Sequence, residues 1–204
     1  MAAKTYQRFP LRVLRPRDPI LGGTSDYAPA EDPVDIEDGF PVAFSGAPGA
    51  STGELVRVET GGTDWIAGWA LEDMTDKNGV KRAAGTQLEY YQAQSQSQVL
   101  VEANLLTGAA GAQVAYVLLA TDLGQAVTLV WDPNYLGAGI GGYYFDKGFS
   151  GGISAGGGVC IIASFTNTRV PSDNEESYSV AGDTDAVVRA YLNPVNFLFS
   201  DGSP

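Results

Sequence analysis

The chain has 204 residues, of which 24 are acidic and 12 are basic, so its formal net charge at pH 7 is −12. It contains no histidine, which removes the most common general base and metal ligand. Its single cysteine, Cys160, excludes an intrachain disulfide and is interpreted as a small buried side chain in an apolar run. No stretch approaches the ~20 consecutive apolar residues of a membrane-spanning helix, so no membrane partner is expected.

The first 39 residues are expected to form an extended N-terminal arm followed by an acidic loop. Residues 1–17 contain five basic residues and no acidic one, and prolines prevent a continuous helix. The apolar side chains of the arm must be covered, either by the chain's own body or by a neighbouring subunit. Residues 25–39 contain six carboxylates, which indicate a solvated loop or, alternatively, a docking surface for a basic arm.

Residues 40–204 are expected to form a β-rich domain. Short apolar runs alternate with turn residues, which favours a β-barrel or β-sandwich with at most one short helix. Val101, Ala103 and Leu105 alternate with polar residues, as in a half-buried strand whose other face is solvated. Residues 109–121 are the best helix candidate, although their alternation is also compatible with a strand.

Two strings in the glycine-rich stretch 137–158 match enzyme motifs. Gly137, Gly139 and Gly142 satisfy G-x-G-x-x-G, but the residues that follow cannot form the helix whose N-terminus would bind phosphate. Ser150 satisfies G-x-S-x-G, but the chain has no histidine to accept its proton. The stretch is therefore interpreted as an insertion, either a flexible loop or a hairpin, whose aromatic side chains make contacts with another protein.

The sequence gives little support for carboxylate catalysis, calcium binding or nucleic-acid binding. Asp183 and Asp185 form one of the carboxylate pairs that chance produces among 24 acids. Asp76, Asn78 and Gly79 indicate a hairpin turn rather than a calcium loop. The acidic body would repel nucleic acid, so protein is the expected partner of the arm. We therefore expect no catalytic residue, no cofactor, no metal and no enzymatic activity.

One pattern over residues 40–199 resembles the capsid decoration (cement) proteins of tailed bacteriophages. The resemblance is carried by "GELVRVETGGTDWIAGWALED", "QVLVEANL", "GGVCIIASF" and "AGDTDAVVRAYLNPVNFLF". It implies a structural protein, made in the host cytoplasm, that binds the major capsid protein on the outer surface of an icosahedral virion as a homotrimer. There it would stabilise contacts between neighbouring capsomers. The chain departs from the family in its arm and in the insertion 137–158.

The predicted contacts with the capsid or a neighbouring subunit lie in the arm and the insertion. We expect the arm's apolar residues to fill a groove on a neighbour while its basic residues pair with carboxylates. Deletion of residues 2–17 should then abolish binding and leave the body folded. The predicted contact residues are Lys4, Arg8, Phe9, Leu11, Arg12, Val13, Leu14, Arg15, Arg17, Tyr143, Tyr144, Phe145 and Phe149.

Two alternatives remain open from the sequence. One is a virion-attached carbohydrate-binding β-domain, in which Trp65, Trp69 and Trp131 would contact the sugar. The other is a different virion structural component, such as a tail or neck protein. Solvent-exposed tryptophan faces would favour the first, and the copy number per particle would identify the second.

Overall fold

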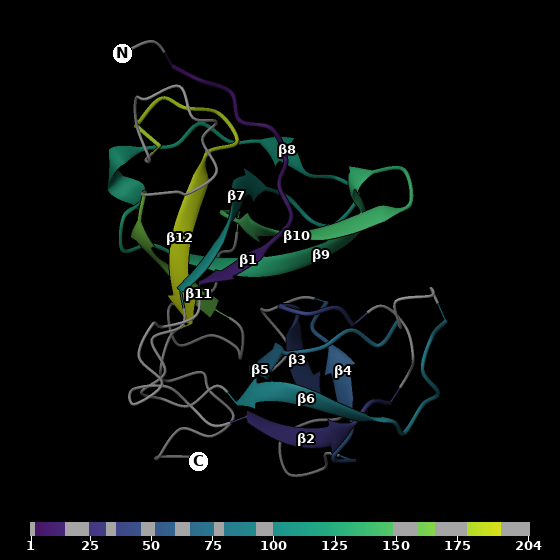
Figure 1. The fold of residues 1–204 in the computed structure, drawn as a ribbon. Helices are drawn as coiled ribbons and strands as arrows, with labels where there is room; N and C mark the ends of the chain where they lie inside the picture. The colour runs from purple at the N-terminus through teal and green to yellow at the C-terminus, as the bar shows by residue number, and fades with distance from the viewer. Residues whose placement is uncertain are drawn as a thin grey trace.

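The computed structural model confirms a mainly β chain in which two sheets form a β-sandwich-like body (Figure 1). In the part of the chain that it describes, the only helical element is the 3-10 turn η2 (Ala120–Asp122). The described residues are 3–14, 25–31, 36–45, 52–59, 66–75, 80–92, 100–148, 159–165 and 179–192.

The first sheet has seven strands in the order β1-β7-β10-β9-β11-β12, with β8 also paired to β7. Because β12 pairs with β7 as well as with β11, strands β7, β10, β9, β11 and β12 close into a ring. The strands are β1 (Arg12–Leu14), β7 (Leu100–Thr107), β8 (Val114–Ala115), β9 (Ala126–Gly137), β10 (Ile140–Asp146), β11 (Val159–Ser164) and β12 (Val187–Leu192).

The second sheet has five antiparallel strands in the order β2-β6-β5-β3-β4. A parallel bridge between Ala30 and Leu55 links its two outer strands, and the amide of Glu31 donates to the Leu55 carbonyl at 3.0 Å. The strands are β2 (Ser25–Pro29), β3 (Pro41–Phe44), β4 (Leu55–Arg57), β5 (Ile66–Ala70) and β6 (Gln87–Gln92).

One apolar core joins the two sheets. As predicted, Val101, Ala103 and Leu105 of β7 are buried together, and Trp69 of the second sheet belongs to the same cluster. Cys160 is also buried there, as expected, and burial raises the pKa of its thiol to about 12. A separate cluster fills the second sheet, so each sheet has its own interior in addition to the shared contact.

Strand β5 serves both cores because its pairing with β3 is irregular. The register shifts by one residue between β3 and β5, so Ile66 and Trp69 pack in the shared core while Ala67 packs inside the second sheet. Gly68 lies in this irregular stretch, and the carbonyl oxygen of Tyr91 occupies the position that a Cβ atom would take. Only glycine allows this close approach of β5 and β6.

The helix prediction for residues 109–121 is wrong. This segment contains β8. After β8 it lies beside residues 182–184, and the Leu118 amide donates to the Asp183 carbonyl at 2.8 Å. Gly111 has a φ of +74°, which a helix does not allow. Hydrogen bonds to neighbouring segments therefore take the place of helical ones, and the alternating pattern describes the segment better.

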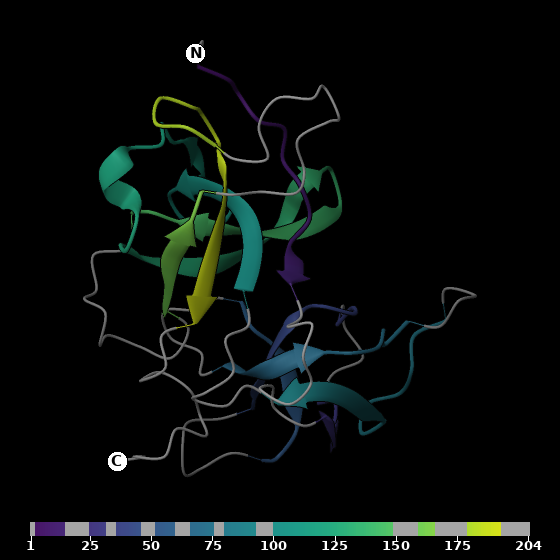
Figure 2. The ribbon, with the colours of Figure 1, turned by 60° about the vertical axis from the view of Figure 1, so that its left-hand side comes forward.

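The predicted arm and acidic loop are parts of the body (Figure 2). Strand β1 pairs with β7 in the first sheet, and β2 pairs with β6 in the second sheet. Residues 25–29 are thus a strand rather than a loop, and no structural division coincides with residues 39 and 40. The arm is extended, as predicted, but it is not a separate appendage.

Candidate interaction surfaces

The described arm, residues 3–14, is hydrogen-bonded to its own chain along its length. Near its start, the Thr184 amide donates to the Lys4 carbonyl at 2.8 Å, and the Tyr6 amide donates to the Thr184 carbonyl at 3.0 Å. The Lys4 amide also donates to the Asp183 carboxylate at 2.8 Å. At its other end β1 pairs with β7, so the arm crosses the first sheet and is fixed at both ends.

Asn104 on β7 anchors the middle of the arm. Its side-chain oxygen accepts hydrogen bonds from the Phe9 amide and the Tyr135 hydroxyl, both at 2.9 Å. Its side-chain nitrogen donates to the carbonyls of Gln7 at 2.9 Å and Asp185 at 2.7 Å. The sequence places Asn104 on the polar face of a strand, but the arm covers that face and buries it completely.

Glu102 is the second buried polar side chain on β7. It is fully buried on β7, and in the ladder it lies between Arg12 of β1 and Arg189 of β12. The Arg189 Nε donates to its carboxylate at 3.1 Å. A buried carboxylate requires such a partner, and Arg189 supplies it from the neighbouring strand β12.

The apolar arm residues pack on the chain itself. Leu11 and Val13 contact the shared core, while Phe9 and Leu14 are partly buried beside β7. The sequence left open whether the chain's own body or a neighbouring subunit covers these apolar side chains. The structure shows that they pack on the chain's own body. Their contact with a neighbour's groove stays a prediction, which would involve only the part of each side chain that remains exposed.

The basic arm residues, by contrast, point outward. Lys4, Arg8 and Arg12 are all exposed. The Arg8 guanidinium lies 5.4 Å from the centre of the Tyr135 ring and donates to the Tyr135 carbonyl at 3.3 Å. These three residues remain predicted contact residues, whereas the predicted contacts Arg15, Arg17 and Phe149 lie outside the described residues.

The predicted contacts at Tyr143, Tyr144 and Phe145 are wrong. All three side chains are fully buried, because β10 lies between β7 and β9 in the first sheet rather than in a surface insertion. The Tyr144 hydroxyl donates to the Gly108 carbonyl at 2.7 Å, and burial raises the pKa of Tyr144, with a further rise from Asp146. The glycine pattern instead forms the β9–β10 turn, where Gly139 has a φ of +75°.

A groove of about 470 Å³ lies where the arm, the β9–β10 hairpin and the second sheet meet. Trp131 lines it, but the Arg57 guanidinium lies 4.3 Å from the centre of the Trp131 ring. Phe40 and Tyr143 also contact this ring, at centroid distances of 5.2 and 4.9 Å. Trp131 therefore does not offer a flat open platform for a sugar.

The remaining tryptophans do not supply such a platform either. Trp69 is buried in the shared core, and Trp65 lies outside the described residues. The carbohydrate-binding alternative expected Trp65, Trp69 and Trp131 to face solvent together. In the described part of the chain, no tryptophan gives that alternative the exposed aromatic face it requires.

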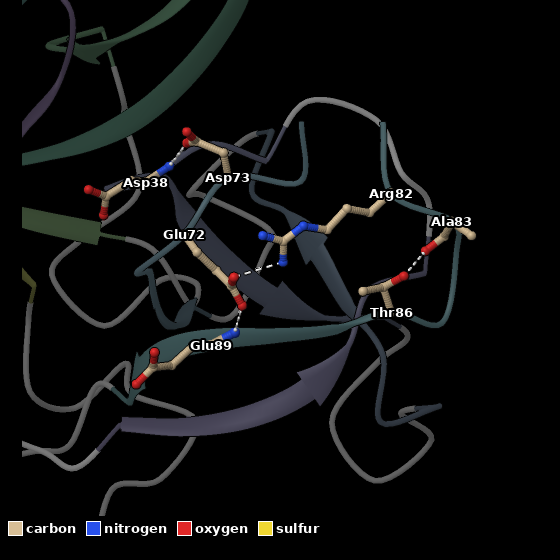
Figure 3. A network of polar contacts seen from close by, with 7 residues as sticks. All are labelled: Asp38, Glu72, Asp73, Arg82, Ala83, Thr86 and Glu89. Carbon is tan, nitrogen blue, oxygen red and sulfur yellow. Dashed lines mark hydrogen bonds and ion pairs between the residues drawn. The ribbon is translucent and has the colours of Figure 1, made fainter. Parts of the chain in front are cut away.

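Carboxylates of the second sheet stabilise its own turns (Figure 3). Glu72 accepts hydrogen bonds from the Arg82 guanidinium at 2.7 Å and from the Glu89 amide at 2.9 Å. Burial tends to raise the pKa of Glu72, but these two partners together lower it below the ordinary value. Asp73 similarly accepts the Asp38 amide at 2.7 Å. In the same view the Thr86 hydroxyl donates to the Ala83 carbonyl at 2.6 Å, so the polar contacts drawn join neighbouring turns.

Charge divides the described molecule into two regions. The first region is the first sheet with its loops and arm (3–14, 100–148, 159–165 and 179–192), and the second region is residues 25–31, 36–45, 52–59, 66–75 and 80–92. The first has six acidic against five basic side chains, and none of its acids is exposed. The second has nine acidic against three basic side chains, and none of its acids is buried. The described surface is therefore acidic at one end only.

The carboxylate pair of the first region has structural partners. Asp183 accepts the amides of Lys4 and Val180, at 2.8 and 2.9 Å. Asp185 accepts the Tyr116 amide at 3.2 Å. Among the described residues, no group of three or more His, Cys, Asp or Glu side chains could hold a metal ion. The same residues include no helix long and apolar enough to cross a membrane.

The arrangement defines a mainly β protein of two packed sheets, with a basic arm on one region and an acidic surface on the other. No protein-family model, curated protein or solved structure matches the chain.

Proposed function

We propose that the protein is a non-enzymatic structural component of a bacteriophage virion. It binds the major capsid protein on the outer surface of the icosahedral head and stabilises contacts between neighbouring capsomers, as a homotrimer. The resemblance of residues 40–199 to capsid decoration proteins motivates the proposal. The two-sheet fold is compatible with this role.

The observation that carries the proposal is the separation of charge between the two regions. Lys4, Arg8 and Arg12 are exposed on the first region, whose described carboxylates are all buried or partly buried. A protein with such polarity is oriented by the field of a charged surface as it approaches. In the proposed complex, the side of the first region that carries the arm faces the capsid, and the acidic second region does not contact it. Many such contacts on one particle act together, so each can be weak.

Charge reversal at matched exposed lysines tests the orientation. Lys4 is exposed on the first region and Lys81 on the second, so Lys4→Glu and Lys81→Glu change the net charge equally. Binding is measured by co-sedimentation with shells of the virus that encodes the chain, stripped of this protein. We expect Lys4→Glu to bind on the order of 10-fold more weakly, because a cation facing the shell becomes an anion. Lys81→Glu should bind like the wild type.

Two results would overturn the proposal. The first is absence of the protein from the outer surface of purified virions, as seen by imaging particles with and without it. The second is an equal effect of the two charge reversals, since that would place neither region against the shell. Circular dichroism of both variants verifies that each remains folded.

A further inference from the structure

An unusual apolar strip lies on the surface of the first region. It consists of Val114, Val117, Leu119 and Leu123, whose exposed fractions are 61%, 49%, 50% and 53%. Single exposed aliphatic residues are ordinary on a protein surface, but four of them within ten residues form a concentrated apolar feature. In Figures 1 and 2 the segment from β8 to η2 crosses the end of the first sheet that is farthest from the second sheet.

Hydrogen bonds hold the strip in an extended shape with its aliphatic side chains outward. Leu118, between two strip residues, is buried and exchanges backbone hydrogen bonds with Asp183 and Gly182, both at 2.8 Å. The Asp122 carboxylate accepts the Leu119 amide at 2.8 Å and the Tyr116 hydroxyl at 3.1 Å. The strip is therefore preformed and needs little ordering when it binds.

The strip itself carries no exposed acidic side chain. The charges beside it are cations: Lys147 pairs with Asp122 at 3.6 Å, and the exposed Lys4 precedes Thr5, which shares Thr184 with Val117 as a bridge partner. Across residues 108–125 the only ionisable acid or base is Asp122, apart from the Tyr116 phenol, and Asp122 is 2% exposed. The chain as a whole carries a formal charge of −12. Copies of such an acidic chain repel one another, and the cost of their approach is smallest at a surface without exposed negative charge. Apolar residues and a lack of charge are also typical of the centre of a protein interface.

We propose that the apolar strip is the surface through which copies of this chain contact one another. This contact holds the acidic second regions away from each other at the far ends of the assembly. The inference deepens the proposed function by naming the surface of the homo-oligomer. Its test uses the purified full chain without any capsid, so the self-contact and capsid binding can fail separately.

The test introduces one like charge into the strip and one elsewhere. Val117→Asp places a carboxylate in the strip, whereas Val80→Asp places one at a 62% exposed valine of the second region. Sedimentation velocity over a range of concentrations gives the oligomeric state of each variant. We expect a wild-type oligomer, the same oligomer for Val80→Asp, and on the order of 100-fold weaker association for Val117→Asp.

A cross-linking experiment gives an independent readout. The natural Cys160 is buried, so it should react poorly with a maleimide. A short bis-maleimide should therefore join copies of Val117→Cys and leave Val80→Cys largely uncoupled. A wild-type chain that stays monomeric at every concentration overturns the proposal, as does a Val117→Asp variant that associates like the wild type. If a monomeric chain loses shell binding on Val117→Asp, the strip docks on the capsid instead, and the proposed capsid binding stands without the homotrimer.

Discussion

The two regions use carboxylates in opposite ways. In the first region Glu102, Asp122, Asp132 and Asp183 are buried, while the described acids of the second region are all exposed or partly exposed. A buried carboxylate must have donors and cations within reach, so it determines which segments pack around it. An exposed carboxylate requires no partner and mainly adds negative potential. Carboxylates thus organise the first region from inside, whereas in the second they give the surface its charge and, at Glu72 and Asp73, hold turns from the outside.

Removal of the arm should cause the largest loss in the free energy of unfolding, because the arm is hydrogen-bonded along its length to the first region. Deleting residues 2–14 removes five hydrogen bonds that join Lys4, Tyr6, Gln7 and Phe9 to the body, together with the β1–β7 pairing. At about 1 kcal/mol each, the five bonds alone correspond to a loss of about 5 kcal/mol in the free energy of unfolding. Urea denaturation measures the loss. This replaces the expectation that the body stays intact without the arm.

A variant with the arm present is the control for that deletion. Arg8→Gln changes an exposed side chain but keeps every backbone hydrogen bond of the arm, so it should cost less than about 1 kcal/mol. If the deletion and Arg8→Gln unfold at the same urea concentration, the arm does not stabilise the first sheet. The first region would then not depend on the segments that pack around its buried polar side chains.

The next largest effect should come from the paired removal of one carboxylate from each region. Glu102→Ala leaves Arg189 without its buried partner, which typically costs about 3–5 kcal/mol. Glu72→Ala removes a partly exposed partner of Arg82, and such pairs contribute about 1 kcal/mol or less. Thermal unfolding of both variants gives the comparison. Equal losses would mean that burial does not distinguish the two regions.

The sequence predicted the fold class better than the site. The alternation of apolar residues can be seen within a single strand, but the distant segment that will pack over that strand cannot. The alternation in β7 correctly gave the buried positions Val101, Ala103 and Leu105. The same alternation assigned Glu102 and Asn104 to solvent, but both are buried by segments far away in the sequence. Gln7 and Phe9 of the arm bind Asn104, and Arg189 of β12 binds Glu102. One signal in the sequence could have indicated this burial. A basic, apolar arm requires a surface that offers both apolar contacts and polar partners, and the face of β7 with Glu102 and Asn104 offers the polar ones.

The aromatic run in β10 shows why local composition misled the site prediction. Glycines around Tyr143, Tyr144 and Phe145 suggested a surface insertion, yet β10 lies in the middle of the first sheet. Gly141 and Gly142 are needed there because side chains of Trp131 and Tyr135 occupy the space of their missing Cβ atoms. The glycines thus report close packing rather than an exposed loop, and only strand order distinguishes the two.

An intermediate effect should depend on pH. Burial tends to raise the pKa of Asp132, but the amides of Asn134 and Gly111 hydrogen-bond to its carboxylate and lower the pKa overall. A lowered folded-state pKa stabilises the protein above the unfolded value of about 3.8, and this contribution is lost as pH falls through the folded value. Asp132→Asn should therefore cost about 2 kcal/mol at pH 7 and progressively less in acid.

Asp73→Asn is the matched control in the second region. Asp73 is exposed and accepts one amide, from Asp38, so its replacement should cost little at any pH. Denaturation curves recorded from neutral to acidic pH give both dependences. A loss for Asp132→Asn that stays constant with pH would show that its charge does not contribute to stability.

The smallest expected effect has the opposite sign. Glu31 is an exposed acid in the second region, where described acids outnumber bases nine to three. Because its neighbourhood is negative, Glu31→Gln should reduce repulsion and raise the thermal midpoint by about 1 °C at low ionic strength. The gain should vanish at high salt, where the Debye length is only about 3 Å at 1 M. Removing an exposed carboxylate such as Glu31 would then stabilise the second region, whereas removing the buried Glu102 destabilises the first. A fall in the midpoint at low salt would show that Glu31 contributes to the fold and that the second region also depends on its carboxylates.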